Sequence, residues 1–82
     1  MNAKDQKNCK DILDVLHDHA PKSVEQTALF GEVNAKSGIA HAQFTAALKI
    51  ADTQGWLTGV AGKFSGQLWA INDEGEIARL QL

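Results

Sequence analysis

The hydrophobic period of the chain changes at Gly55, and this change limits the possible fold more than any other feature. Before Gly55, apolar residues recur every three or four positions, as in amphipathic helices. From Trp56 to Asn72 they alternate every second position around a loop flanked by glycines, as in a β-hairpin. The sequence therefore predicts an α+β fold. Its 82 residues are enough for one core, so we expect a single domain over residues 1–82.

The first predicted helix has an apolar stripe with the spacing i, i+3, i+4, i+7 and i+11, formed by Cys9, Ile12, Leu13, Leu16 and Ala20. The helix must end near Ala20, because the residue before a proline disfavours the helical region and Pro21 follows. Residues 1–7 are polar, and we expect them to form a flexible N-terminus.

The second helix has two alternative starting points. Ser23 and Gln26 have the spacing of a capping box, which would start the helix there and place Leu29, Phe30 and Val33 on its apolar face. Alternatively, residues 27–29 form a short strand and the helix begins near Phe30. Both alternatives end at Gly38, since glycine readily adopts the left-handed conformation that closes helices.

A third helix follows, with Phe44, Ala47, Leu48 and Ala51 at helical spacing until Gly55 ends it. A short turn that contains Gly38 joins it to the second helix, which predicts a helix-turn-helix. Ile39 would fill the space between the two helices.

The hairpin register follows if Ala61 pairs with Gln67. This register places Val60 opposite Leu68, Gly59 opposite Trp69 and Leu57 opposite Ile71. The face that carries Leu57, Gly59, Trp69 and Ile71 belongs in the core, and Gly59 leaves room for the Trp69 indole. Asn72 or Asp73 can cap a last short helix, whose Ile77 and Leu80 we expect to dock on the first helix.

Residues 29–75 resemble winged-helix domains of the bacterial transcription-regulator type. The resemblance rests on Gly38-Ile39 before the third helix, on Gly55-Trp56-Leu57 after it, and on Trp69-Ala70-Ile71 followed by the turn from Asn72 to Gly75. It implies a small winged helix with three helices, a two-stranded β-hairpin wing and a short C-terminal helix. It also implies binding to double-stranded DNA as a transcriptional regulator or a phage-type repressor-like protein.

In such a domain the third helix enters the major groove and the wing tip touches the DNA backbone or the minor groove. The exposed positions would be His41, Ala42, Gln43, Thr45, Ala46 and Lys49 on the helix, with Lys63 and Ser65 at the tip. Gln43 has the chemistry to bind adenine, whereas Lys49 and Lys63 suit phosphates. The alternative interpretation of these residues is a solvated polar helix face.

The charge distribution gives DNA binding modest support. The net charge is −2, but between Val33 and Leu68 the cations Lys36, Lys49 and Lys63 face a single anion, Asp52. This segment contains no arginine, and Ala42 and Ala46 offer no side-chain hydrogen bond.

A second interpretation is a winged helix that binds a protein partner and no DNA. On the outer face of the hairpin, Trp56, Val60 and Leu68 align into an apolar strip, which would be covered by the last helix or bind a partner. Under the DNA-binding interpretation the strip would instead bind a second copy, because one domain with few phosphate contacts needs avidity to bind DNA usefully.

Catalytic and metal-binding signals are weak. The sequence has no nucleophile elbow, phosphate-binding loop or dinucleotide motif, so we expect no enzyme and no cofactor. His17 and His19 point about 200° apart on a helix and cannot share one metal ion, so solvated helix-end histidines are the simpler interpretation. Cys9 is expected to be a core residue. The lone cysteine and the lack of a long apolar run favour a cytoplasmic protein without a membrane segment.

Overall fold

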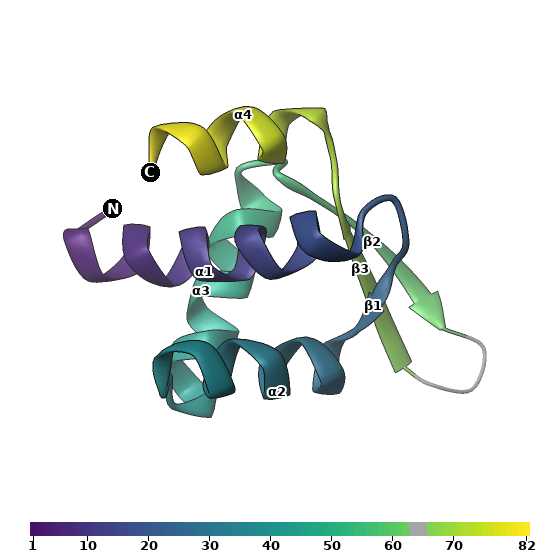
Figure 1. Ribbon diagram of the computed structural model, residues 1–82, viewed down its shortest axis with the longest axis horizontal. Helices are drawn as coiled ribbons and strands as arrows, with labels where there is room; N and C mark the ends of the chain where they lie inside the picture. The colour runs from purple at the N-terminus through teal and green to yellow at the C-terminus, as the bar shows by residue number, and fades with distance from the viewer. Residues whose placement is uncertain (63–65) are drawn as a thin grey trace.

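The computed structural model describes residues 1–62 and 66–82, which form four helices and a three-stranded antiparallel sheet (Figure 1). The elements follow the order α1 (Ala3–His19), β1 (Val24–Glu25), α2 (Gln26–Ser37), α3 (His41–Thr53), β2 (Leu57–Gly62), β3 (Gly66–Ile71) and α4 (Asp73–Gln81). In Figure 1, α1 lies between α4 and α2, and the hairpin of β2 and β3 reaches away from the helices. The α+β class predicted from the sequence is confirmed.

Helix α1 begins earlier than predicted. Asn2 is its N-cap, and the Asn2 side chain accepts a hydrogen bond from the backbone N–H of Asp5 at 2.8 Å. An ion pair of 2.9 Å between Lys7 and Asp11, one turn apart, joins the added segment to the rest of the helix. Residues 3–7 are therefore helical, whereas the prediction placed them before the first helix. The helix ends before Pro21, as predicted.

Neither predicted start of α2 is correct. Val24 and Glu25 form strand β1, which pairs with Trp69 and Leu68 of β3, so the helix begins at Gln26. Its N-cap is Glu25, which makes no side-chain capping bond. The backbone before Gln26 is thus extended by pairing with the sheet, and Ser23 lies too early to cap the helix. The helix ends at Gly38 with φ of 71°, in agreement with the prediction.

The hairpin register agrees with the prediction at every pair. Ala61 pairs with Gln67, Val60 with Leu68, Gly59 with Trp69 and Leu57 with Ile71. The sheet order is β1-β3-β2, so the predicted two-stranded hairpin gains a third, two-residue strand next to β3.

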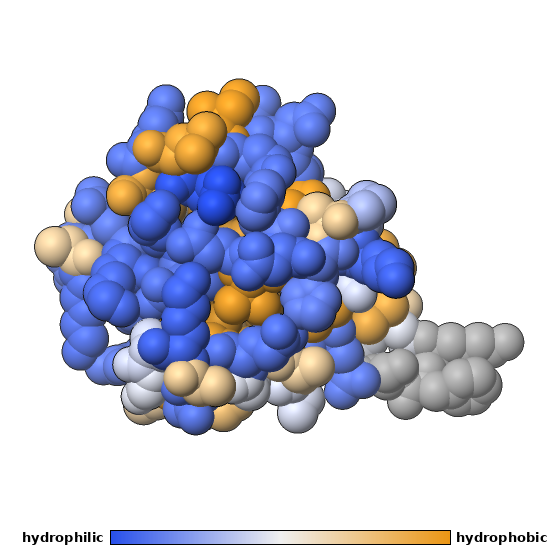
Figure 2. All heavy atoms as spheres, viewed as in Figure 1, coloured by the Kyte–Doolittle hydropathy of each residue, from blue (hydrophilic) through white to orange (hydrophobic). Residues whose placement is uncertain are grey.

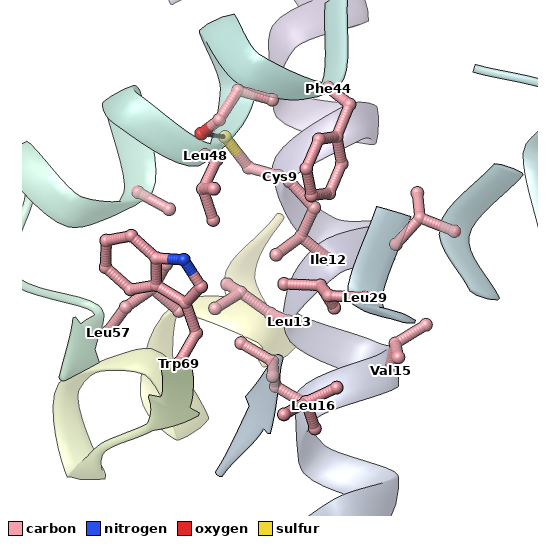
Figure 3. Close-up of a cluster of buried hydrophobic side chains, with 14 of the residues drawn as sticks. Cys9, Ile12, Leu13, Val15, Leu16, Leu29, Phe44, Leu48, Leu57 and Trp69 are labelled. Carbon is pink, nitrogen blue, oxygen red and sulfur yellow. Dashed lines mark hydrogen bonds between the residues drawn. The ribbon is translucent and has the colours of Figure 1, made fainter. Parts of the chain in front are cut away.

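The core lies between α1, α2, α3 and the inner face of the sheet (Figure 3). Its largest fully buried side chains are Phe44, Ile12, Leu13, Leu16, Leu29, Val33 and Cys9. Trp69 points into this cluster beside Leu57 and Leu48, and its Nε1–H donates to Gln26 at 3.0 Å. A Cβ atom at Gly59 would lie 2.7 Å from Trp69 Cζ3, so the predicted need for glycine opposite the indole is confirmed. Ala20, predicted to complete the apolar stripe of α1, is exposed.

Helix α4 docks through a face that was not predicted. Asn72 caps it, as expected, with its side chain accepting from the N–H of Gly75 at 2.9 Å. The buried residues are Gly75 and Ala78, however, whereas Ile77 and Leu80 are 53% and 78% exposed. A Cβ at Gly75 would collide with the backbone oxygen of Trp56, so the close approach of α4 requires small residues on the docked face. Figure 2 shows hydrophobic atoms over α4 on an otherwise mostly hydrophilic face.

Candidate nucleic-acid interface

Helix α3 follows α2 after a short turn, and its inner face is packed in the core. Phe44, Ala47 and Ala51 have no exposed surface, and Leu48 is 4% exposed. The turn before the helix is braced by Asn34, whose Nδ2 donates to the backbone oxygen of Ile39 at 2.9 Å. Ile39 itself is buried, as predicted for a residue that fills the space between the two helices. The orientation of the outer face of α3 is therefore set by core packing.

The outer face of α3 is the surface predicted to read DNA, and all six helix positions named for it are exposed. These are His41, Ala42, Gln43, Thr45, Ala46 and Lys49. At 3.6 residues per turn, Ala42, Ala46 and Lys49 lie opposite the buried face. His41 and Thr45 flank them on one side, and Gln43 flanks them on the other. Of the six named positions, two alanines and one lysine thus lie at the centre of this face.

Two of the predicted DNA-contacting residues also make contacts within the protein. The His41 ring packs against Phe30 in a T-shaped arrangement, with ring centroids 5.0 Å apart and planes at 80°. Phe30 in turn packs against Phe44 at 5.2 Å. The Thr45 hydroxyl donates to the backbone oxygen of His41 at 3.0 Å. It keeps acceptor capacity for a ligand, because a hydroxyl has two lone pairs.

Three shallow grooves border the outer face of α3. The first, of about 240 Å³, runs between α3 and the first turns of α1, and its lining is Lys4, Asp5, Asn8, Ala42, Gln43 and Ala46. The second, of about 340 Å³, is lined by Ala46, Lys49, Ile50, Thr53 and Gln54. The third, of about 190 Å³, separates α3 from the sheet and is lined by Gln26, Thr45, Leu48, Lys49, Asp52 and Trp69.

Lys4 is a candidate contact residue that the sequence reasoning missed. It lies across the first groove from Gln43, because α1 extends back to Ala3. The signal in the sequence was Asn2, a favourable N-cap followed by an acidic residue in the first turn.

The charges near α3 are sparser than the sequence count suggested. Lys36, one of three cations in the central segment, lies on α2 and pairs with Asp14 at 3.5 Å. Lys49 shares the third groove with Asp52, so a cation and an anion border it together. Lys63 and Ser65, predicted at the wing tip, lie outside the described residues. Within the described part of α3, Lys49 is the only lysine or arginine.

The residues of the predicted partner-binding strip differ in how far they are exposed. Val60 is 54% exposed on the outer face of the sheet, directly opposite the half-buried Leu68. Trp56 precedes β2 and is half-buried against the core. Of the three strip residues, Val60 is therefore the one that is exposed, whereas Trp56 and Leu68 are half-buried.

The two histidines near the end of α1 bind separate carboxylates. His17 Nδ1 lies 2.9 Å from Glu76 of α4, and His19 Nε2 lies 2.8 Å from Glu32 of α2. The histidines thus tie α1 to two different helices. Among residues 1–62 and 66–82, no three His, Cys, Asp or Glu side chains are grouped to hold a metal ion.

Cys9 is a core residue, as predicted. It has no exposed surface, and its Sγ lies 3.5 Å from the backbone oxygen of Ala47. Burial, aided by the negative charge of Asp5, raises the pKa of the thiol to about 11. The thiol is therefore protonated and unreactive at neutral pH.

No protein-family model, no curated protein and no solved structure matches this chain. None of the helices in the described ranges has both the length and the apolar character needed to cross a bilayer.

Proposed function

We propose that the chain is a winged-helix domain that binds double-stranded DNA through the outer face of α3. The observation that carries the proposal is the outer face of α3 itself: a helix anchored by four core residues leaves Gln43, Thr45 and Lys49 exposed. The order of elements supports it, because a helix-turn-helix leads directly into a hairpin. A helix held this rigidly can enter a major groove without reordering its backbone.

The side chains divide into two roles under this proposal. Lys49 binds phosphates and positions the domain, together with Lys63, which lies outside the described residues. Gln43 reads base edges, for which adenine is the partner that suits an amide. Ala42 and Ala46 lack bulk and let the helix approach closely, and alanine makes apolar contact with the thymine methyl group.

A titration of labelled duplex DNA over a range of salt concentrations tests the proposal. Lys49→Glu is expected to weaken binding to every sequence and to lower the log–log salt slope by about one, since each phosphate contact contributes about 0.9. Lys63→Glu is expected to act in the same way. Gln43→Ala is expected to relax sequence preference, at about 1–3 kcal/mol of discrimination for a good base contact.

Lys22→Glu is the matched control, because Lys22 is exposed on the turn after α1 and the charge change is the same. Equal slopes for the wild type and Lys49→Glu would contradict the proposed role of Lys49. No binding by the wild type at low salt would contradict the proposal as a whole.

A second candidate function, a winged helix that binds a protein and no DNA, is favoured by the outer face of the sheet. Val60 is more than half exposed there, and the residues around it on β2 carry no charge. Wild-type protein that fails to bind DNA at low salt would favour this candidate.

A further inference from the structure

We propose that strand β2 pairs with β2 of a second copy of the chain, in antiparallel orientation, to give a two-fold dimer with one continuous sheet. The proposal concerns the edge of the sheet and does not depend on DNA binding. It rests on the composition of β2, on the direction of its backbone groups, and on the shortness of the opposite sheet edge.

The edge formed by β2 lacks the usual protection against strand pairing. Edge strands in soluble proteins are commonly guarded by charged side chains, proline, a bulge or shortness. Strand β2 has the sequence LTGVAG, with no charge and no proline. Its six pairs with β3 run without interruption, so it contains no bulge. In the described part of the chain, β3 is its only strand neighbour.

The free backbone groups on this edge follow from the hydrogen-bond pattern. The N–H of Asn72 donates to the oxygen of Trp56 at 3.4 Å, which fixes these two residues as a hydrogen-bonded pair. Hydrogen-bonded and non-hydrogen-bonded pairs alternate in an antiparallel ladder. Thr58 and Val60 therefore bond to β3. The open edge carries the backbone groups of the alternate residues, Leu57, Gly59 and Ala61.

These three residues are self-complementary about a two-fold axis at Gly59. Gly59 then faces Gly59 of the second copy, and Leu57 faces Ala61 of the second copy. On the outer face, Thr58 lies next to Val60 of the second copy, a β-branched pair of the kind that stabilises sheets. No like charges meet along the interface, because the strand carries none.

The other edge of the sheet favours a closed dimer over an open chain of copies. Strand β1 has only two residues, Val24 and Glu25, so it offers too little backbone to pair with β2 of another copy. A head-to-tail arrangement that would extend into a fibre is disfavoured for this reason. The pairing of β2 with β2 uses the same surface on both copies and closes on itself.

Sedimentation equilibrium from micromolar to millimolar concentrations tests the proposal. The apparent mass of the wild type is expected to rise to twice the monomer mass. Ala61→Pro removes an N–H that points to the open edge, and Val60→Lys places a charge on it. Both variants are expected to stay monomeric where the wild type dimerises. Ile77→Lys on α4 is the control, since it changes an exposed apolar residue outside the sheet, and it is expected to dimerise like the wild type.

Amide hydrogen exchange of the wild type gives an independent readout that needs no variant. Exchange at Gly59 and Ala61 is expected to slow as concentration rises, whereas exchange at Thr58 and Val60 is expected to be protected already in the monomer. A wild type that stays monomeric at millimolar concentration would overturn the proposal. So would a dimer that survives Ala61→Pro and Val60→Lys, or one that only Ile77→Lys disrupts.

Discussion

Gly59 and Gly31 differ in the space around them, so the same substitution is expected to have opposite effects on stability. A side chain at Gly59 would meet Trp69 Cζ3 and Gln67 Nε2 at 2.7 Å, whereas one at Gly31 would meet nothing within 4 Å. We expect Gly59→Ala to lower the free energy of unfolding by about 1–3 kcal/mol, as for an overpacked core. Gly31→Ala, in an exposed part of α2, is the control and should raise it by about 0.5–1 kcal/mol. Urea denaturation measures both, and a neutral Gly59→Ala would mean that the indole can move aside.

The buried thiol of Cys9 is expected to make the free energy of unfolding decrease with pH in the alkaline range. Burial raises the pKa of its thiol from the ordinary 9.0 to about 11, so the folded chain holds a proton that the unfolded chain releases. The protonated thiol therefore contributes to the free energy of unfolding in full below pH 9. This contribution is lost as pH rises from 9 to 11, at about 1.4 kcal/mol per pH unit. Urea denaturation of the wild type and Cys9→Ala across this range isolates the effect. Above pH 9 the free energy of unfolding should fall more steeply with pH for the wild type than for Cys9→Ala. Parallel pH profiles would contradict the proposed effect of Cys9.

Single residues with strong local constraints were the most predictable parts of the site. The spacing of Phe44, Ala47, Leu48 and Ala51 identified the buried face of α3, and the exposed positions followed from it. The pairing of Gly59 with Trp69 was also predictable, because an indole needs a small residue opposite it. The T-shaped contact of His41 with Phe30 was not, because it joins two helices whose relative position only the fold determines.

At the scale of elements, the sequence did not predict strand β1 or the docked face of α4, because both depend on contacts with residues distant in the sequence. Strand β1 has two residues and pairs with β3 more than 40 positions later, so it leaves no periodic signal. The docked face of α4 carries Gly75 and Ala78, which a hydrophobicity pattern does not distinguish from a solvated face. Ile77 and Leu80 have the stronger apolar signal, yet they are exposed because close helix packing requires small residues.

The Asn72 side chain links the start of α4 to the turn after α3, and its two hydrogen bonds can be separated by substitution. Its Oδ1 caps α4 at Gly75 N, and its Nδ2 donates to the oxygen of Gly55 at 2.8 Å. We expect Asn72→Ala to lower the free energy of unfolding by about 1–2 kcal/mol. Asn72→Asp keeps the cap and loses the donor, so its cost should be smaller. Thermal and urea unfolding measure both. Equal costs would assign the effect to the bond with Gly55 and not to the cap.

At the scale of the whole molecule, Asp14 links three helices through charge. Its Oδ1 lies 3.0 Å from Arg79 of α4 and 4.0 Å from Lys10 of α1, and its Oδ2 lies 3.5 Å from Lys36 of α2. Lys10 also donates to the backbone oxygen of Arg79 at 2.8 Å. The Asp14 side chain is only 18% exposed, so this cluster is less screened by solvent than a surface ion pair.

Neutralising Asp14 leaves three cations close together without the charge that balances them. We expect Asp14→Asn to lower the free energy of unfolding by about 1–3 kcal/mol and to speed amide exchange in α4, which would lose one of its ties to α1. Glu32→Gln is the control, because its pair with His19 is nearly half exposed and contributes at most about 1 kcal/mol. Raising the salt concentration should narrow the gap between Asp14→Asn and the wild type, since salt also screens the repulsion among the cations. If Asp14→Asn costs no more than Glu32→Gln, packing of Gly75 and Ala78 holds α4 in place and the charge cluster contributes little.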